Sequence, residues 1–207
     1  YQRIHHMNST AETGVYEKEQ KSLFFTGASY CWNVIFRADI LKRGWRIYDL
    51  ALYEDIACHM IPVKARKIAY VKEALYFHRK YSTSLTQRTS SEAHYLIVDA
   101  VGRLIHDISQ ADHSRWYQAA LIDLVKSFTF YYVYRLITLG KCPVSPQRLY
   151  EIQTQFLSLT TETPHFFAEP LVWLHLHYPK ILLSLLQNPL TRKWVGRKTC
   201  QYHNKRK

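Results

Sequence analysis

The sequence is poor in cysteine, and its few cysteines form no C-x-x-C pair. The four are Cys31, Cys58, Cys142 and Cys200, each far from the next along the chain. This spacing is unlike the ligand pattern of a structural zinc site, and a disulfide framework needs a denser set in a chain of 207 residues. We therefore expect a reducing, cytosolic setting.

The chain also lacks a long apolar run and a targeting segment. Its longest candidate span, Leu171 to Leu186, is interrupted by two histidines, a proline and a lysine, whereas a membrane-spanning helix needs about 20 predominantly apolar residues. We interpret this segment as buried or lying at an interface. The first ten residues resemble neither a signal peptide nor an initiator-methionine start, so we expect the chain to be a fragment of a longer protein.

Acidic residues are scarce as well. Lys and Arg number 28 against 16 Asp and Glu, which gives a formal net charge of +12. Such a surface attracts nucleic acid, anionic lipid or phosphorylated substrates, and composition does not choose among them. Because no RNA-binding or helix-turn-helix signature is present, nucleic acid is not an expected partner. The pairs His5-His6 and His175-x-His177 have no cysteine or carboxylate to complete a ligand set, so no metal site is expected in this chain.

Up to about Gln87 the local patterns predict short strands and loops. Lys67 to Val71 and Ala74 to Lys80 alternate and are rich in aromatic and β-branched residues, which predicts two strands joined as a hairpin. An earlier strand is expected to pass into a short helix that ends at Gly44. Residues 1–88 are therefore predicted to form one domain of α/β class.

Beyond Gln87 the patterns predict helices. Thr89 and Glu92 form a capping-box pair ahead of a helix with one apolar face. That face consists of Ile97, Val98, Val101, Leu104, Ile105 and Ile108. Further helices are predicted from Ser114 towards Gly140, from Ser145 with Pro146 at its first position, before Pro179, and from Pro179 onward. Residues 89–207 are therefore predicted to form a C-terminal α-helical bundle.

Two acids stand side by side in the stretch LYEDIACHM, which runs from Leu52 to Met60. Glu54 and Asp55 precede a predicted short helix, and Pro62 is expected to shorten or kink it. One interpretation is that both acids complement the helix dipole, at about 0.3–1 kcal/mol each. The other is that one of them accepts a proton from a substrate.

Several loose motifs follow one another between Ser29 and Gln87. Trp32-Asn33 is followed by Phe36-Arg37, then by YED at Tyr53 to Asp55, then by the strands KIAYV and ALYFHRK and a Ser-x-Ser-Leu-Thr stretch. In order and spacing this segment resembles the acceptor half of bacterial family 2 glycosyltransferases. These are inverting enzymes of GT-A fold that build capsular, lipopolysaccharide and teichoic-type polymers. The resemblance implies a partial GT-A fold followed by the helical bundle.

The resemblance also implies a reaction and its partners. Asp55 would be the general base, and Glu54 would orient the acceptor or the base. The donor would be a nucleotide sugar, and the acceptor a glycan or a polyprenyl-diphosphate-linked sugar. The family holds a divalent cation, Mg or Mn, with a D-x-D motif. Because this sequence has no D-x-D, we expect that motif before Tyr1 in the full-length enzyme, and we expect this chain to be inactive alone.

Other residues take roles by the same resemblance, each beside a plainer interpretation. Trp32 would be a platform for a sugar ring and Asn33 a hydrogen-bonding partner of a sugar hydroxyl. The plainer interpretation is that Trp32 is a half-buried strand residue and that Asn33 caps a turn. His78, Arg79 and Lys80 would bind the donor diphosphate, or they form a solvated strand end.

The C-terminus carries charge of one sign. Residues 191–207 contain seven Lys or Arg and no acid. One interpretation is a frayed, solubilising tail. The other is a basic segment that holds a cytoplasmic protein peripherally at the anionic inner face of the membrane, with Trp194 inserted into the lipid. The alternative to an enzyme is accordingly a non-catalytic basic helical module that docks on a membrane surface or an anionic partner.

Overall fold

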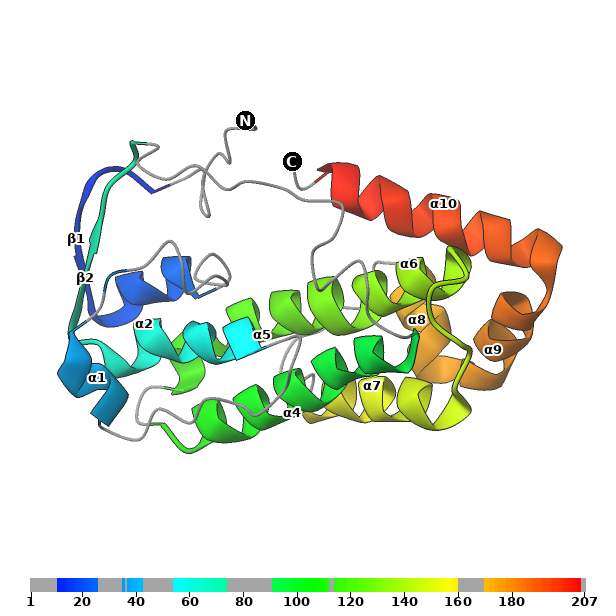
Figure 1. The fold of residues 1–207 in the computed structure, drawn as a ribbon, viewed down its shortest axis with the longest axis horizontal. Coiled ribbons are helices and arrows are strands. Elements are labelled where there is room, and N and C mark those ends of the chain that lie inside the picture. The colour runs from blue at the N-terminus through cyan, green and yellow to red at the C-terminus, as the bar shows by residue number, and fades with distance from the viewer. Residues whose placement is uncertain are drawn as a thin grey trace. The chain divides into compact units, whose positions relative to one another are not determined.

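The computed structural model describes residues 11–25, 35, 37–42, 54–73, 91–111, 114–159 and 170–205. This part of the chain is mostly helical and includes one small two-stranded sheet (Figure 1). The chain divides into two compact units. Unit 1 consists of residues 1–89 and 100–121, and unit 2 of residues 90–99 and 122–207.

Unit 1 combines short helical segments with the sheet. Its elements are β1 (Gly14–Glu17), the 3-10 helix η1 (Lys18–Phe24), α1 (Ala38–Lys42), the 3-10 helix η3 (Glu54–His59), α2 (Met60–Lys64), β2 (Lys67–Tyr70) and the 3-10 helix η5 (Ser114–Tyr117). Helix α1 lies where a short helix was predicted. The structure also confirms a strand at the KIAYV stretch, as β2. The hairpin partner predicted for it at residues 74–80 lies outside the described residues.

The partner that the structure gives to β2 is β1, some fifty residues earlier in the chain. The two strands are antiparallel, with Gly14 opposite Tyr70 and Glu17 opposite Lys67. An ion pair of 2.6 Å between Lys67 and Glu17 links the strands at one end of the ladder. On one face the ring of Phe24 lies 4.7 Å from that of Tyr16 and 5.3 Å from that of Tyr70, so η1 packs on the sheet through aromatic contacts.

The helix predicted after the two acids is short, as Pro62 implied. It begins as η3 at Glu54 and continues as α2, which ends at Lys64. Pro62 lies in the first turn of α2 and has no N–H to donate to a preceding carbonyl. The change from 3-10 to α-helix just before Pro62 keeps the proline near a helix start, where a missing N–H is tolerated.

Unit 2 is built from helices. They are the 3-10 helix η4 (Ser91–Tyr95), the π-helix η6 (Val125–Tyr131), α6 (Tyr132–Thr138), α7 (Pro146–Leu159), α8 (Pro170–His177), α9 (Pro179–Gln187) and α10 (Pro189–Lys205). Helices α4 (Leu96–Ser109) and α5 (Gln118–Leu124) contribute residues to both units. The apolar face predicted for α4 is confirmed, since five of its six residues are buried and Ile105 is half-buried.

The helix predicted from Ser114 towards Gly140 is present as the run η5, α5, η6 and α6. Its end is a glycine cap. Gly140 has a φ of +70°, its N–H donates to the Ile137 carbonyl at 3.0 Å, and the Lys141 N–H donates to the Leu136 carbonyl at 2.9 Å. This pair of bonds satisfies carbonyls that a helix end leaves unbonded, and it favours glycine at the left-handed position.

Capping also sets the later helix starts. Ser145 accepts the Arg148 N–H on its Oγ at 3.4 Å, at the predicted start of α7. Asn188 accepts the Leu190 N–H at 2.9 Å at the start of α10. The interpretation of residues 191–207 as a frayed tail is wrong for residues 191–205, which belong to helix α10 (Pro189–Lys205). Within the described residues, the structure contains no helix that combines the length and apolar character needed to cross a membrane.

A buried histidine lies in the core of unit 2. The Nδ1 atom of His175 is 2.8 Å from the Tyr134 hydroxyl, and the Phe130 ring packs against both side chains. The side chain of His175 is fully buried, and burial lowers its pKa to about 4 because the imidazolium would lose its hydration. His175 is therefore neutral in the folded chain at neutral pH.

This burial predicts a pH-dependent stability. Between pH 6.5 and about 4 the unfolded chain binds a proton at residue 175 that the folded chain does not, so the free energy of unfolding falls as pH falls, by up to about 3 kcal/mol. His175→Asn keeps a hydrogen-bonding group near the Nδ1 position and does not titrate. We expect its urea-unfolding free energy to depend less steeply on pH in this range. The exposed His177→Asn is the matched control, and equal slopes for all three proteins would contradict the prediction.

Candidate functional site

The structure describes the backbone of one part of the predicted site. Glu54 and Asp55 are the first two residues of η3, so the predicted helix start at these acids is confirmed. Trp32, Asn33 and the basic stretch His78 to Lys80 lie outside the described residues. Whether these groups converge with the acids stays a prediction. The rest of the site is therefore built from what holds the segment 54–65.

His59, the last residue of η3, ties this segment to the end of η1. Its Nδ1 donates to the backbone carbonyl of Phe25, because a carbonyl oxygen can only accept. Both residues are fully buried, and their rings lie 5.5 Å apart. This bond gives a donor to the Phe25 carbonyl, which lies at the C-terminal end of η1. His59 therefore links two chain segments that are 34 residues apart.

Tyr117 holds the next turn. Its hydroxyl donates to the Pro62 carbonyl at 2.9 Å, and its ring lies 5.5 Å from that of Phe25. Because α2 ends at Lys64, the Pro62 carbonyl is one of those left without a partner inside the helix. Burial raises the pKa of Tyr117 to about 12, so the hydroxyl keeps the proton that it donates.

Lys21 holds the end of the segment. Its ammonium donates to the Ala65 carbonyl, directly after α2. The side chain is buried, and burial lowers the pKa of Lys21 because the charged amine loses contact with water. A cation at a helix C-terminus also interacts favourably with the carbonyl dipoles there. Three buried polar side chains thus fix the backbone that follows the two acids.

Sequence reasoning missed all three of these side chains. A lysine in a 3-10 helix and a tyrosine far along the chain from the acids carry no local signal of their role. His59 lies in the same short stretch as Glu54 and Asp55, and that closeness was the one available hint.

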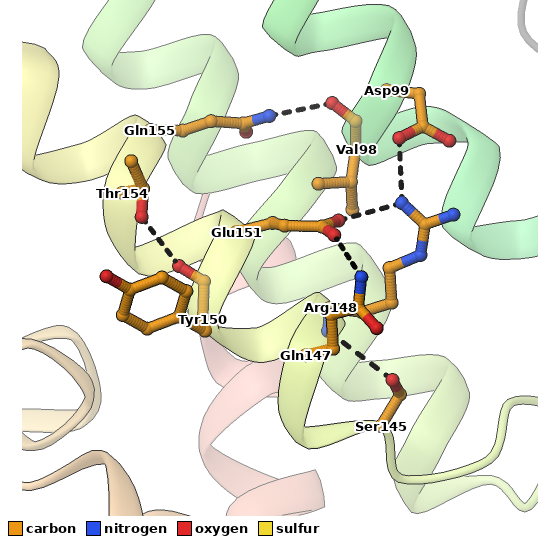
Figure 2. A network of polar contacts seen from close by, with 9 residues as sticks. All are labelled: Val98, Asp99, Ser145, Gln147, Arg148, Tyr150, Glu151, Thr154 and Gln155. Atoms are coloured by element: carbon orange, nitrogen blue, oxygen red, sulfur yellow. Dashed lines mark hydrogen bonds and ion pairs between the residues drawn. The ribbon is translucent and has the colours of Figure 1, made fainter.

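Unit 2 contains a separate candidate, a cavity of about 390 Å³ beside the start of α7. It is lined by Ala93, Tyr95, Leu96, Pro143, Ser145 and Arg148. Figure 2 shows the polar network next to it. Arg148 Nη1 contacts Asp99 Oδ1 and Glu151 Oε2, both at 2.7 Å, and Gln155 donates to the Val98 carbonyl at 2.7 Å. These contacts join α7 to α4.

The charges of this network decide what the cavity can bind. Arg148 is matched by two carboxylates, so the three side chains together carry a formal charge of −1 and do not favour a phosphate. The Tyr95 hydroxyl donates to the Pro143 carbonyl at 2.6 Å and accepts the Ser145 N–H at 3.3 Å. Burial raises the pKa of Tyr95, so it stays protonated. The network therefore holds α7 against α4.

The described residues also bear on metals. Among them, no group of three or more His, Cys, Asp or Glu side chains lies close enough to hold a metal ion. The predicted divalent cation therefore has no ligand set in the described part of the chain.

Comparison with protein-family models, with curated proteins and with solved structures finds no match for this chain.

The anchoring of segment 54–65 predicts the effect of removing one hydroxyl. Tyr117→Phe leaves the ring in place and the Pro62 carbonyl without its donor, so we expect the free energy of unfolding to fall by about 1–3 kcal/mol. Tyr150→Phe, at a ring that is 68% exposed, is the matched control and should change it by less than about 0.5 kcal/mol. Urea unfolding measures both. Equal stability of the two variants would show that the Pro62 carbonyl does not depend on Tyr117.

Proposed function

We propose that this chain is the acceptor-side part of an inverting glycosyltransferase of the family 2 type. The enzyme would transfer a sugar from a nucleotide sugar to a glycan or a polyprenyl-diphosphate-linked acceptor. The observation that carries the proposal is the ordered set of motifs from Trp32-Asn33 through Tyr53-Glu54-Asp55 to the two strand-like stretches. The backbone of η3 and β2 supports it, because the acids begin a helix and the first four residues of KIAYV form a strand.

In the proposed reaction Asp55 is the base. The oxygen of an acceptor hydroxyl attacks the anomeric carbon of the donor, and the proton of that hydroxyl passes to the Asp55 carboxylate. As the new carbon–oxygen bond forms, the bond from the anomeric carbon to the diphosphate oxygen breaks, and the nucleoside diphosphate leaves with the electron pair. One displacement inverts the anomeric centre and needs no covalent sugar–enzyme intermediate.

The local structure supports this role in two ways. A carboxylate must be ionised at neutral pH to act as the base, and the partial positive charge at the start of a helix favours the ionised form. A base must also be held in place, and the bonds from His59, Tyr117 and Lys21 fix the backbone that follows Asp55. Glu54, its neighbour, orients the acceptor or the base in this proposal.

The rest of the proposal concerns the whole enzyme. Residues 1–88 would belong to a GT-A fold and residues 89–207 to a helical region beside it. Trp32 and Asn33 would bind the acceptor sugar, and His78, Arg79 and Lys80 the donor diphosphate. A D-x-D motif outside this chain would supply the ligands for Mg or Mn. The enzyme would work in the cytoplasm, at the inner face of the membrane.

Asp55→Asn tests the proposed base directly. Because an amide cannot accept the proton, we expect kcat of the full-length enzyme to fall by about 10²- to 10⁴-fold while donor affinity and melting temperature change little. Release of nucleoside diphosphate in the presence of acceptor measures the rate, and calorimetry measures donor affinity.

Two further substitutions control for the loss of a negative charge. Glu54→Gln should lower the rate less than Asp55→Asn and should act partly through the acceptor KM. Glu73→Gln, at an exposed acid after β2, should leave both the rate and the acceptor KM unchanged. If Asp55→Asn kept more than about half of the wild-type kcat, Asp55 would not be the base.

Trp32→Ala tests the proposed acceptor platform. A sugar ring packs its C–H face on an aromatic ring, so we expect the acceptor KM to rise while donor affinity stays the same. Steady-state kinetics with varied acceptor and donor calorimetry separate the two effects. An unchanged acceptor KM together with a lowered melting temperature would show instead that Trp32 is a core residue.

A further inference from the structure

The last part of the chain has no acidic residue at all. Glu169 is the final acid, and eight Lys or Arg follow it. They are Lys180, Arg192, Lys193, Arg197, Lys198, Lys205, Arg206 and Lys207. One of them, Lys180, lies in α9, and five lie in α10, so these two helices have a positive field without local compensation from their own residues. A partner for this region should be anionic.

Helix α10 places apolar and basic side chains together on one exposed face. Leu190, Lys193, Trp194 and Arg197 follow the spacing i, i+3, i+4 and i+7, which puts them on one side of an α-helix. All are exposed, Leu190 at 79% and Trp194 at 38%. We call these four residues the α10 face. A face that carries a large aliphatic, an indole and two cations can contact both the headgroups and the apolar edge of a lipid interface.

The opposite side of α10 docks on the body of unit 2. Val195 is fully buried, and a Cβ at Gly196 would lie 3.2 Å from Thr138 Oγ1, so α10 approaches α6 closely at this glycine. The Arg192 Nε donates to the Leu186 carbonyl at 2.7 Å and Thr191 Oγ1 to the Leu185 carbonyl at 2.6 Å. These bonds cap the end of α9, whose last carbonyls need donors. The rotation of α10, and with it the direction of the α10 face, is thereby fixed.

We propose that the α10 face docks on an anionic lipid surface, with Leu190 and Trp194 inserted among the headgroups and Lys193 and Arg197 paired with lipid phosphates. The cations gain from the surface potential, and the two apolar side chains leave water only if the partner has an apolar interior. A nucleic-acid backbone would interact favourably with the two cations alone and would leave Leu190 in water. The observations therefore favour lipid. The inference does not depend on the proposed glycosyl transfer.

Vesicle co-sedimentation of the 207-residue chain tests this proposal. We expect binding to vesicles of phosphatidylcholine with about one third phosphatidylglycerol, weak binding to pure phosphatidylcholine, and release at 1 M salt, where the screening length is about 3 Å. Removing both charges with Lys193→Gln and Arg197→Gln should weaken partitioning about 30-fold, at about fivefold per charge. Leu190→Ser with Trp194→Ser should weaken it by at least as much, since two apolar groups no longer insert.

Matched controls separate the face from the general charge of the chain. Arg103→Gln with Lys141→Gln removes two exposed cations elsewhere, and Tyr150→Ser with Leu157→Ser removes two exposed apolar groups from α7. Both pairs should bind vesicles nearly as the wild type does. Equal losses in the control and test pairs would overturn the proposal. Loss with the charge pair but not with Leu190 and Trp194 would also overturn it, and would show an anion-binding surface such as one for nucleic acid.

Discussion

The fold depends on one constraint, which is that each buried carbonyl at the end of a short helix needs a hydrogen-bond donor. In unit 1 the donors come from distant side chains, with His59 bonded to Phe25, Tyr117 to Pro62 and Lys21 to Ala65. A carbonyl left buried without such a bond costs about 1–3 kcal/mol, comparable to a large share of the stability of a domain. The segment that begins with Glu54 and Asp55 is therefore held by hydrogen bonds after its first turn, and this restraint supports the proposed role of Asp55 as the base.

Local chemistry made much of unit 2 predictable. A glycine at residue 140, a Ser-Pro pair at residues 145–146 and a proline at residue 179 mark helix ends through backbone rules that need no distant partner. The apolar spacing of α4 is likewise a property of the helix alone. Helix α10 was not predicted because its sequence has no apolar stripe and is rich in Lys and Arg, and its docking depends on Gly196 meeting Thr138.

What could not be predicted depends on residues far apart in the chain. The partner of β2 is β1, and no turn signal joins strands separated by fifty residues. Lys21 is buried although lysine is mostly exposed, because its amine bonds the Ala65 carbonyl. For the candidate site, the start of a helix at the two acids followed from local pattern. Their proposed chemistry came from a resemblance over about sixty residues, and the anchors behind them came only from the structure.

The central claim is that a carboxylate at residue 55 supports inverting sugar transfer. The most direct test is the anomeric configuration of the new glycosidic linkage made by the full-length enzyme from a nucleotide sugar of known configuration, read from the proton NMR coupling at the anomeric position. The account predicts that the new linkage has the configuration opposite to that of the donor, and that Asp55→Asn makes no detectable product in the same time. A product that retains the donor configuration, or one formed equally well by the variant, would contradict it.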